Sequence, residues 1–142
     1  MRAQGGFTLI EIMVVLVIIA ALAYVVGTNV IGRLDKARLE TTKIQIKQLE
    51  TALKQFKLDN AFYPETQQSL QALVTPPTVG RIPNRYASEG YLEGSTVPKD
   101  QWGNEFIYIG PDQTQDGSYE IISPGPDGLY PSDDDITSRN IQ

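Results

Sequence analysis

The feature that most constrains this chain is an almost unbroken run of apolar side chains from Phe7 to Val26. An α-helix rises about 1.5 Å per residue, so about 20 apolar residues match the thickness of a bilayer. The run therefore predicts a helix that lies in lipid or in another apolar environment. One charge interrupts the run, at Glu11, and a carboxylate within such a helix is unfavourable unless it has a partner.

The residues before the run form a short leader that ends in Gly5 and Gly6. A secretory signal peptide has its small-residue cleavage site after the apolar stretch, whereas here the glycines come before it. Cleavage between Gly6 and Phe7 would leave the apolar helix on the mature chain and create an α-amine. We hypothesise that this amine, on a neighbouring copy, pairs with Glu11 and sets the register of an assembly. The alternative is an ordinary membrane anchor that carries an unrelated glutamate.

The sequence Gly-Phe-Thr-Leu-x-Glu at residues 6–11 resembles the leader junction of type IV pilins and pseudopilins. The resemblance implies that a prepilin peptidase cuts after Gly6 and that Phe7 is then N-methylated, which keeps the positive charge. It further implies a pilin-like α+β fold, in which one long N-terminal α-helix packs on a small antiparallel β-sheet domain.

The chain is long enough for one small domain beside the anchor helix. We expect residues 1–6 to form the leader and residues 7–32 to form the hydrophobic transmembrane and filament-core half of the helix. Residues 33–142 should form a globular domain that includes the second half of the helix. The resemblance places the protein in the inner membrane as a single-pass protein, with this domain in the periplasm.

Apolar residues continue beyond Gly27 at the three- and four-residue steps of an amphipathic helix. They are Ile31, Leu34, Ile46, Leu49, Leu53 and Phe56. Proline does not occur between Phe7 and Phe62, so we predict one helix from about Thr8 to Asp59.

The remaining chain predicts three short elements joined by loops rich in proline and glycine. Residues 66–74 favour a second, short helix with Thr66 as its N-cap. Residues 105–109 and 119–122 are rich in β-branched and aromatic side chains, and a polar connection joins them. We therefore predict an antiparallel hairpin, with Trp102 before it as a core anchor.

Composition excludes several classes of function. The chain contains no cysteine and no histidine, so disulfides, Ser-His-Asp catalysis and histidine-ligated zinc sites are excluded. It also lacks a glycine-rich phosphate-binding loop, and we expect no enzymatic activity. The formal net charge is −5 and the sequence has no basic stripe, so we expect no binding to nucleic acid.

Residues 124–136 form the second informative segment. Four carboxylates lie within nine residues of this proline-stiffened stretch. Calcium prefers oxygen ligands, whereas softer metals would need the absent histidine or cysteine. The spacing does not fit an EF-hand. A solvated acidic turn is the alternative interpretation.

This segment resembles the calcium loop of the major pseudopilins of type II secretion systems, which have a Gly-Pro/Ala-Asp-Gly turn followed by Asp-Asp-Ile. Here these are residues 125–128 and 134–136. The resemblance implies calcium ligands from the side chains of Asp127, Asp134 and Asp135 and from the backbone carbonyls of Pro124 and Leu129. The loop is about one residue longer than in some relatives, so the choice among Asp133, Asp134 and Asp135 stays open.

Further matches extend the resemblance over most of the chain. The stretch 97–104, Val-Pro-Lys-Asp-Gln-Trp-Gly-Asn, is similar to a Pro-Lys-Asp-Pro-Trp-Gly-Asn signature of that family. Two positions depart from the family pattern, because Gln101 stands where proline is usual and Ser69 where glycine is usual.

The resemblance implies a structural subunit that polymerises into a helical periplasmic pseudopilus and drives export of folded proteins across the outer membrane. Expected partners are further copies of the chain, minor pseudopilins, the inner-membrane platform and assembly proteins, and the prepilin peptidase. Two alternatives remain, a type IV pilin and a membrane-tethered calcium-binding module that never polymerises. The absence of cysteine and the presence of Thr28, where many type IV pilins have proline, favour a pseudopilin.

Overall fold

The computed structural model describes residues 6–141, except for the side chains of residues 26–31. Residues 1–5 of the predicted leader lie outside this range. The chain divides into two compact units, the first ending at Ala37 and the second beginning at Arg38. The sequence placed this boundary between residues 32 and 33.

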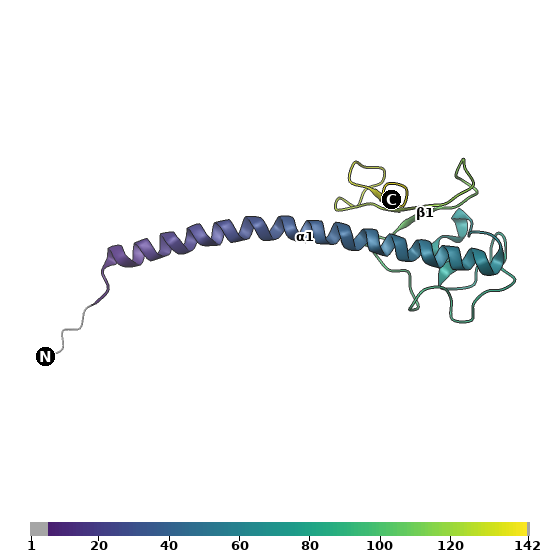
Figure 1. The fold of residues 1–142 in the computed structure, drawn as a ribbon, viewed down its shortest axis with the longest axis horizontal. Coiled ribbons are helices and arrows are strands. Elements are labelled where there is room, and N and C mark those ends of the chain that lie inside the picture. The colour runs from purple at the N-terminus through teal and green to yellow at the C-terminus, as the bar shows by residue number, and fades with distance from the viewer. Residues whose placement is uncertain (1–5, 142) are drawn as a thin grey trace. The chain divides into compact units, whose positions relative to one another are not determined.

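One helix, α1, covers Leu9–Asn60 and contains 52 residues (Figure 1), which confirms the predicted helix. Its end has a local cause. Ala61 follows with a positive φ of 67°, and its N–H donates to the Lys57 carbonyl at 2.7 Å. This left-handed residue terminates the helical hydrogen bonding, in the position that glycine usually occupies.

The predicted helix at residues 66–74 is wrong in detail. Two 3₁₀ turns occur instead, η1 at Thr66–Gln68 and η2 at Leu70–Leu73. Ser69 separates them, because its backbone (φ 53°, ψ −171°) cannot continue a helix. The N-cap of η1 is Glu65 and not Thr66. Thr66 instead donates its N–H and its hydroxyl to Asp112, at 2.7 and 2.9 Å.

The described residues form a three-stranded antiparallel sheet of order β1-β2-β3. Its strands are β1 at Ile107–Ile109, β2 at Glu120–Ser123 and β3 at Ile136–Thr137. The predicted hairpin is confirmed by the pairing of β1 with β2. Strand β1 begins later than expected, because Glu105 pairs with Lys99. Strand β3 was not predicted.

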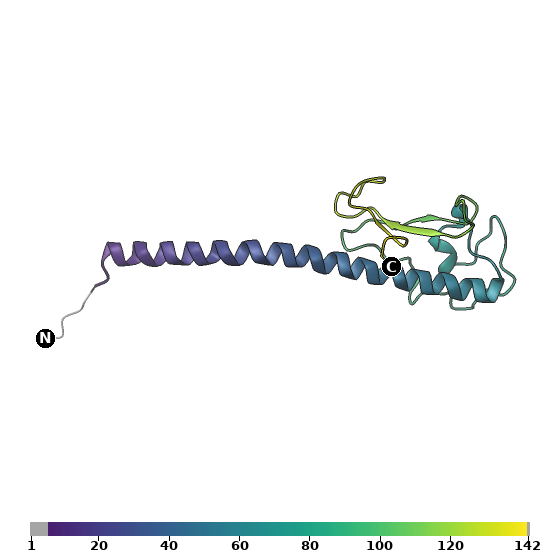
Figure 2. The same ribbon diagram turned by 45° about the horizontal axis from the view of Figure 1, so that its top comes forward.

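The core of the second unit lies between α1 and the sheet, which run beside each other in Figures 1 and 2. The buried residues of α1 recur at helical spacing, as predicted. They are Ile46, Leu49, Ala52, Leu53 and Phe56. Leu34, which the sequence placed in the same pattern, is instead 54% exposed, because it lies in the first unit and outside this core. Leu70, Leu73, Phe106, Tyr108, Ile121 and Ile136 complete the main contacts. Trp102 is half-buried against this cluster, in agreement with its expected role as an anchor.

The buried hydroxyl of Tyr108 ties the sheet to the segment after α1. It donates to the Pro64 carbonyl at 2.8 Å. Burial, and then the nearby Tyr119, raise the pKa of Tyr108 above its ordinary value. The hydroxyl therefore stays protonated and keeps donating throughout the neutral range.

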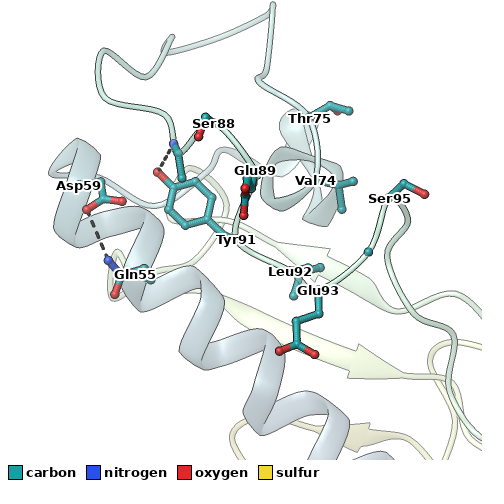
Figure 3. Close-up of a pocket in the computed structure, with 13 residues that line it drawn as sticks. Gln55, Asp59, Val74, Thr75, Ser88, Glu89, Tyr91, Leu92, Glu93 and Ser95 are labelled. Atoms are coloured by element: carbon teal, nitrogen blue, oxygen red, sulfur yellow. Dashed lines mark hydrogen bonds between the residues drawn. The ribbon is translucent and has the colours of Figure 1, made fainter.

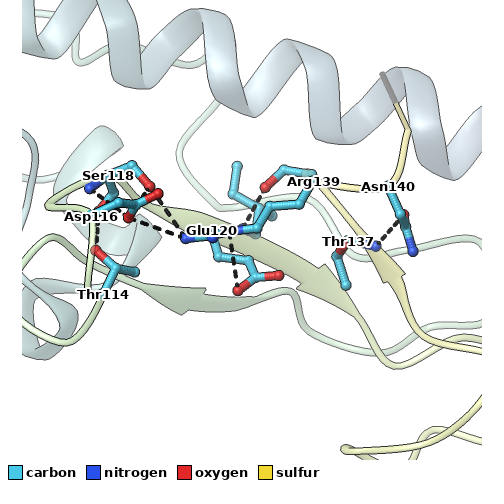
Figure 4. A network of polar contacts seen from close by, with 9 residues as sticks. Thr114, Asp116, Ser118, Glu120, Thr137, Arg139 and Asn140 are labelled. Atoms are coloured by element: carbon cyan, nitrogen blue, oxygen red, sulfur yellow. Dashed lines mark hydrogen bonds and ion pairs between the residues drawn. The ribbon is translucent and has the colours of Figure 1, made fainter.

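The segment after β3 is fastened to the β1–β2 connection by Arg139. Its guanidinium lies 3.3 Å from Asp116 and 3.6 Å from Glu120 (Figure 4). Ser118 donates to Asp116 through its hydroxyl and its N–H. These two hydrogen bonds, of which the one from the hydroxyl has the larger effect, lower the pKa of Asp116. The pairs are partly exposed, so their contribution to stability is small.

Candidate functional site

The start of α1 holds the predicted processing and assembly residues. Gly6, Phe7 and Thr8 precede the helix, and the Phe7 side chain is 81% exposed. A Cβ added at Gly6 would meet nothing within 4 Å. The described residues of the chain therefore leave this peptide bond accessible and do not themselves require a glycine there.

Glu11 forms a reciprocal cap with Thr8. The Thr8 N–H donates to Glu11 Oε2 at 3.4 Å, and the Glu11 N–H donates to Thr8 Oγ1 at 3.3 Å. This is a capping box, which satisfies two N–H groups that a helix start leaves without partners. The Thr-x-x-Glu spacing at residues 8–11 was a sequence signal for this box, which was not predicted.

The large apolar side chains from Leu9 to Val25 are exposed, many of them by more than half. They include Leu9, Ile10, Leu16, Val17, Ile19 and Leu22. Among the residues that the structure describes, none of the helices meets the length and apolarity required to cross a membrane.

The acidic loop connects β2 to β3 and brings together the acidic residues that the resemblance selected. Asp127, Asp134 and Asp135 all lie around the hydroxyl of Ser132. The distances from Ser132 Oγ to their nearest carboxylate oxygens are 3.5, 2.6 and 3.3 Å. Asp133 is exposed, and no contact with another described residue brings it into this group.

These three carboxylates compete for a single proton, because a serine hydroxyl has only one to donate. That hydroxyl lowers the pKa of Asp134 below its ordinary value. The donors are hard oxygens, the type that calcium prefers. However, the described residues contain no group of three or more acidic, histidine or cysteine side chains arranged as a ready metal cage.

Two glycines shape the loop. Gly125 has φ +69°, and a Cβ added there would lie 2.5 Å from the Asp134 carbonyl and 2.9 Å from its carboxylate. Gly128 has φ +68°, and a Cβ there would lie 3.0 Å from Asn104 Oδ1. At Gly125 the close approach of the Asp134 backbone excludes a side chain. At Gly128 the left-handed backbone favours glycine, and the Asn104 side chain would have to shift by a few tenths of an ångström to admit a Cβ.

A buried carboxylate beside the loop was missed by the sequence analysis. Asp100 is 5% exposed and accepts hydrogen bonds from Trp102, Asn104 and Ser123. In the sequence, residues 97–104 were identified only as part of a family signature. An Asp two residues before a Trp-Gly turn was the available signal, because Asp commonly accepts the N–H two residues ahead.

A separate groove of about 760 Å³ lies between the end of α1 and residues 87–95 (Figure 3). Asp59, Glu89 and Glu93 give it acidic walls. Tyr91 lies along it and accepts the Ala87 N–H at 3.3 Å through its hydroxyl. The groove lies outside the predicted sites.

Comparisons with known proteins agree on one family. The family profile described as "Type II secretion system (T2SS), protein G" matches residues 29–139. The profile described as "Prokaryotic N-terminal methylation motif" matches residues 1–23.

Individual relatives match over most of their length. The "Type II secretion system core protein G" of Escherichia coli K12 is 44% identical over 138 residues, which cover 97% of this chain and 92% of the relative. The protein of that name from Pseudomonas aeruginosa is 45% identical over 127 residues, covering 89% and 87%.

A solved structure also matches in fold, with a TM-score of 0.68 and 38% identity over 78% of this chain and 93% of the other. It is the crystal structure of the major pseudopilin from the type 2 secretion system of enterohaemorrhagic Escherichia coli. The chain therefore belongs to the family of type II secretion system protein G and carries the prokaryotic N-terminal methylation motif.

Proposed function

We propose that this chain is a structural subunit that polymerises through α1 into a periplasmic pseudopilus and drives export of folded proteins across the outer membrane. The observation that carries the proposal is the exposed apolar surface from Leu9 to Val25. Exposed apolar surface of this extent marks a membrane or protein interface. Lipid would cover it before assembly and neighbouring copies after it. Family membership decides in favour of a pseudopilin over a type IV pilin.

In this proposal the leader is removed after Gly6 by a prepilin peptidase and Phe7 is N-methylated. The subunit then stands in the inner membrane with its globular domain in the periplasm. Other partners are the minor pseudopilins and the inner-membrane platform and assembly proteins, and the chain itself carries out no catalysis. The exposed Phe7 and the unobstructed Gly6 support access of a peptidase.

Glu11 is the residue we propose to pair with the Phe7 amine of a neighbouring copy. Glu11→Gln keeps an oxygen that can accept the Thr8 N–H but removes the charge, whereas Glu11→Leu removes both. We expect both variants to lose filaments when produced with the complete secretion system. The measurement is the amount of sheared or cross-linked filament at equal subunit level.

Glu40→Gln is the matched control, because Glu40 lies on the same helix and pairs with Lys43 at 3.1 Å in an exposed position. It should assemble normally. Filaments of normal number and length from both Glu11 variants would defeat the assembly role. A wild-type chain that is processed but never polymerises would point to the membrane-tethered module instead.

We also propose that the acidic loop binds calcium through Asp127, Asp134 and Asp135, together with the carbonyls of Pro124 and Leu129. The convergence of three carboxylates on Ser132 supports this assignment. A bound cation would neutralise the mutual repulsion of these groups and would tie the loop together. Because it would bind only the folded loop, it would stabilise the folded state by mass action.

The test is thermal unfolding of the chain with calcium and with a chelator. Asp127→Ala should abolish the calcium-dependent rise in melting temperature, and Asp134→Ala should do the same. Asp133→Ala is the matched control from the same loop, and it should keep the full rise. A calcium effect that survives Asp127→Ala, or one that is lost with Asp133→Ala, would show that the ligands are misassigned.

A further inference from the structure

Asp100 is a buried carboxylate without a cationic partner among the described residues, so its role needs an explanation. Such a group is costly unless hydrogen bonds satisfy it. Its Oδ1 accepts the N–H groups of Trp102 at 3.0 Å and Asn104 at 2.8 Å. Its Oδ2 accepts the side-chain amide of Asn104 at 3.2 Å and the hydroxyl of Ser123 at 2.7 Å. Asp100 thereby fixes the orientation of two polar side chains.

Those two side chains hold both backbone groups of the same glycine. The Asn104 amide donates to the Gly125 carbonyl at 2.8 Å. The Gly125 N–H donates to the hydroxyl of Ser123 at 3.2 Å. The Gly125 N–H and the Pro124 carbonyl belong to one planar peptide unit. The hydrogen bond to Ser123 therefore also orients the Pro124 carbonyl, which is among the proposed calcium ligands.

The held glycine also touches the acidic part of the loop. Gly125 packs so closely on Asp134 that a Cβ would collide with its carbonyl and its carboxylate. A shift of Gly125 would therefore move Pro124 directly and Asp134 by contact. The second shaping glycine, Gly128, packs against Asn104.

We propose that Asp100 and Asn104 are positioning residues for the calcium loop, acting through the two backbone groups of Gly125. The inference rests on the calcium function proposed above. Residues that orient metal ligands without touching the ion typically contribute about 10- to 100-fold to affinity. We expect an effect of this size from the Asn104 amide.

The experiment is calcium titration by calorimetry into the full-length chain in detergent micelles, after removal of metal with a chelator. Asn104→Ala removes the donor to Gly125 and leaves the two N–H contacts of Asp100. It should raise the Kd for calcium by about 10- to 100-fold. Asn140→Ala is the matched control, because Asn140 also holds a backbone group, accepting the N–H of Thr137 (Figure 4), but makes no contact with the Asp100 cluster. It should bind as the wild type does.

Ser123→Ala provides an independent variant in case Asn104→Ala does not fold. It releases the N–H of Gly125 and removes the hydroxyl that donates to Asp100, but it keeps the Asn104 amide. A merely structural role would lower the melting temperature in chelator and leave Kd unchanged for the folded fraction. Wild-type Kd in both variants, with binding lost in Asp127→Ala, would overturn the positioning role and leave the calcium proposal intact. Absence of binding by the wild type would overturn both.

Discussion

Replacing Ser69 by glycine should stabilise the second unit. Ser69 has φ 53° and ψ −171°, a region that only glycine occupies readily. Holding another residue there costs about 1–3 kcal/mol. Glycine would lose the exposed hydrogen bond from the Gln71 N–H to Ser69 Oγ, of 3.2 Å, at a cost of a few tenths of a kcal/mol.

The flexibility of glycine in the unfolded chain offsets a further part of the gain, about 0.4–1 kcal/mol. The net expectation is a stabilisation of about 1 kcal/mol, equivalent to a rise of about 4 °C in melting temperature for a unit of this size. Denaturant or thermal unfolding of Ser69→Gly against the wild type measures it.

Ser69→Ala is the control that separates backbone strain from capping. Alanine keeps the strain and loses the side-chain acceptor, so it should destabilise by about 0.5–1 kcal/mol. At an ordinary position glycine is the less stable of the two. If Ser69→Gly proved less stable than Ser69→Ala, the assigned backbone conformation of Ser69 would be wrong.

Three further outcomes follow from particular contacts. Ala61→Gly should raise stability by about 0.5–1 kcal/mol in denaturant unfolding, because Ala61 ends α1 with φ 67°, and an unchanged midpoint would contradict this. Tyr108→Phe should lower the free energy of unfolding by about 1–3 kcal/mol, because the buried Pro64 carbonyl loses its donor. A smaller loss would indicate that water replaces the hydroxyl. Burial raises the pKa of Asp112, but the two hydrogen bonds from Thr66 outweigh it and the pKa is lowered. The stabilisation from Asp112 is thus present above its unfolded pKa of about 4 and is lost as the pH falls through the folded value. The melting temperatures of the wild type and Asp112→Asn should therefore converge in acid, and a constant difference would refute the linkage.

Periodicity predicted those parts of the fold that depend on one face of one element. The apolar spacing on α1 identified Ile46, Leu49, Leu53 and Phe56, and all four are buried. The antiparallel hairpin followed from two β-rich segments and a polar connection. In each case the local sequence pattern agrees with the burial seen in the structure, so these features could be predicted without knowing which elements pack against them.

The missed features depend on contacts between distant segments. The 66–74 segment has helical apolar spacing, yet the left-handed Ser69 divides it into 3₁₀ turns. Strand β3 has only two residues and exists because Ile136 and Thr137 pair with β2. Neither the backbone conformation of Ser69 nor a two-residue pairing leaves a periodic signal.

The candidate sites also differ in whether a local sequence pattern or contacts between distant segments define them. Residues of the acidic loop could be selected from composition and resemblance, since their chemistry is contained in one segment. Asp100 left only a local turn signal, because its proposed role depends on Ser123 and Gly125, which lie more than twenty residues away. Its burial is a property of the folded unit and not of the local sequence.

In the proposed assembly, Glu11 would serve both a local and an assembly requirement. In the single chain its Oε2 accepts the Thr8 N–H at 3.4 Å, a long and exposed contact. A carboxylate at a helix start contributes only about 0.3–1 kcal/mol there. Breaking half of a buried ion pair costs about 3–5 kcal/mol, so the proposed pairing with a Phe7 amine in a filament core would outweigh capping. The two roles are also compatible, because the cap uses one carboxylate oxygen and the other can accept the amine. The cap therefore keeps the acid at the start of α1 in the unassembled chain, where the proposed partner amine would meet it.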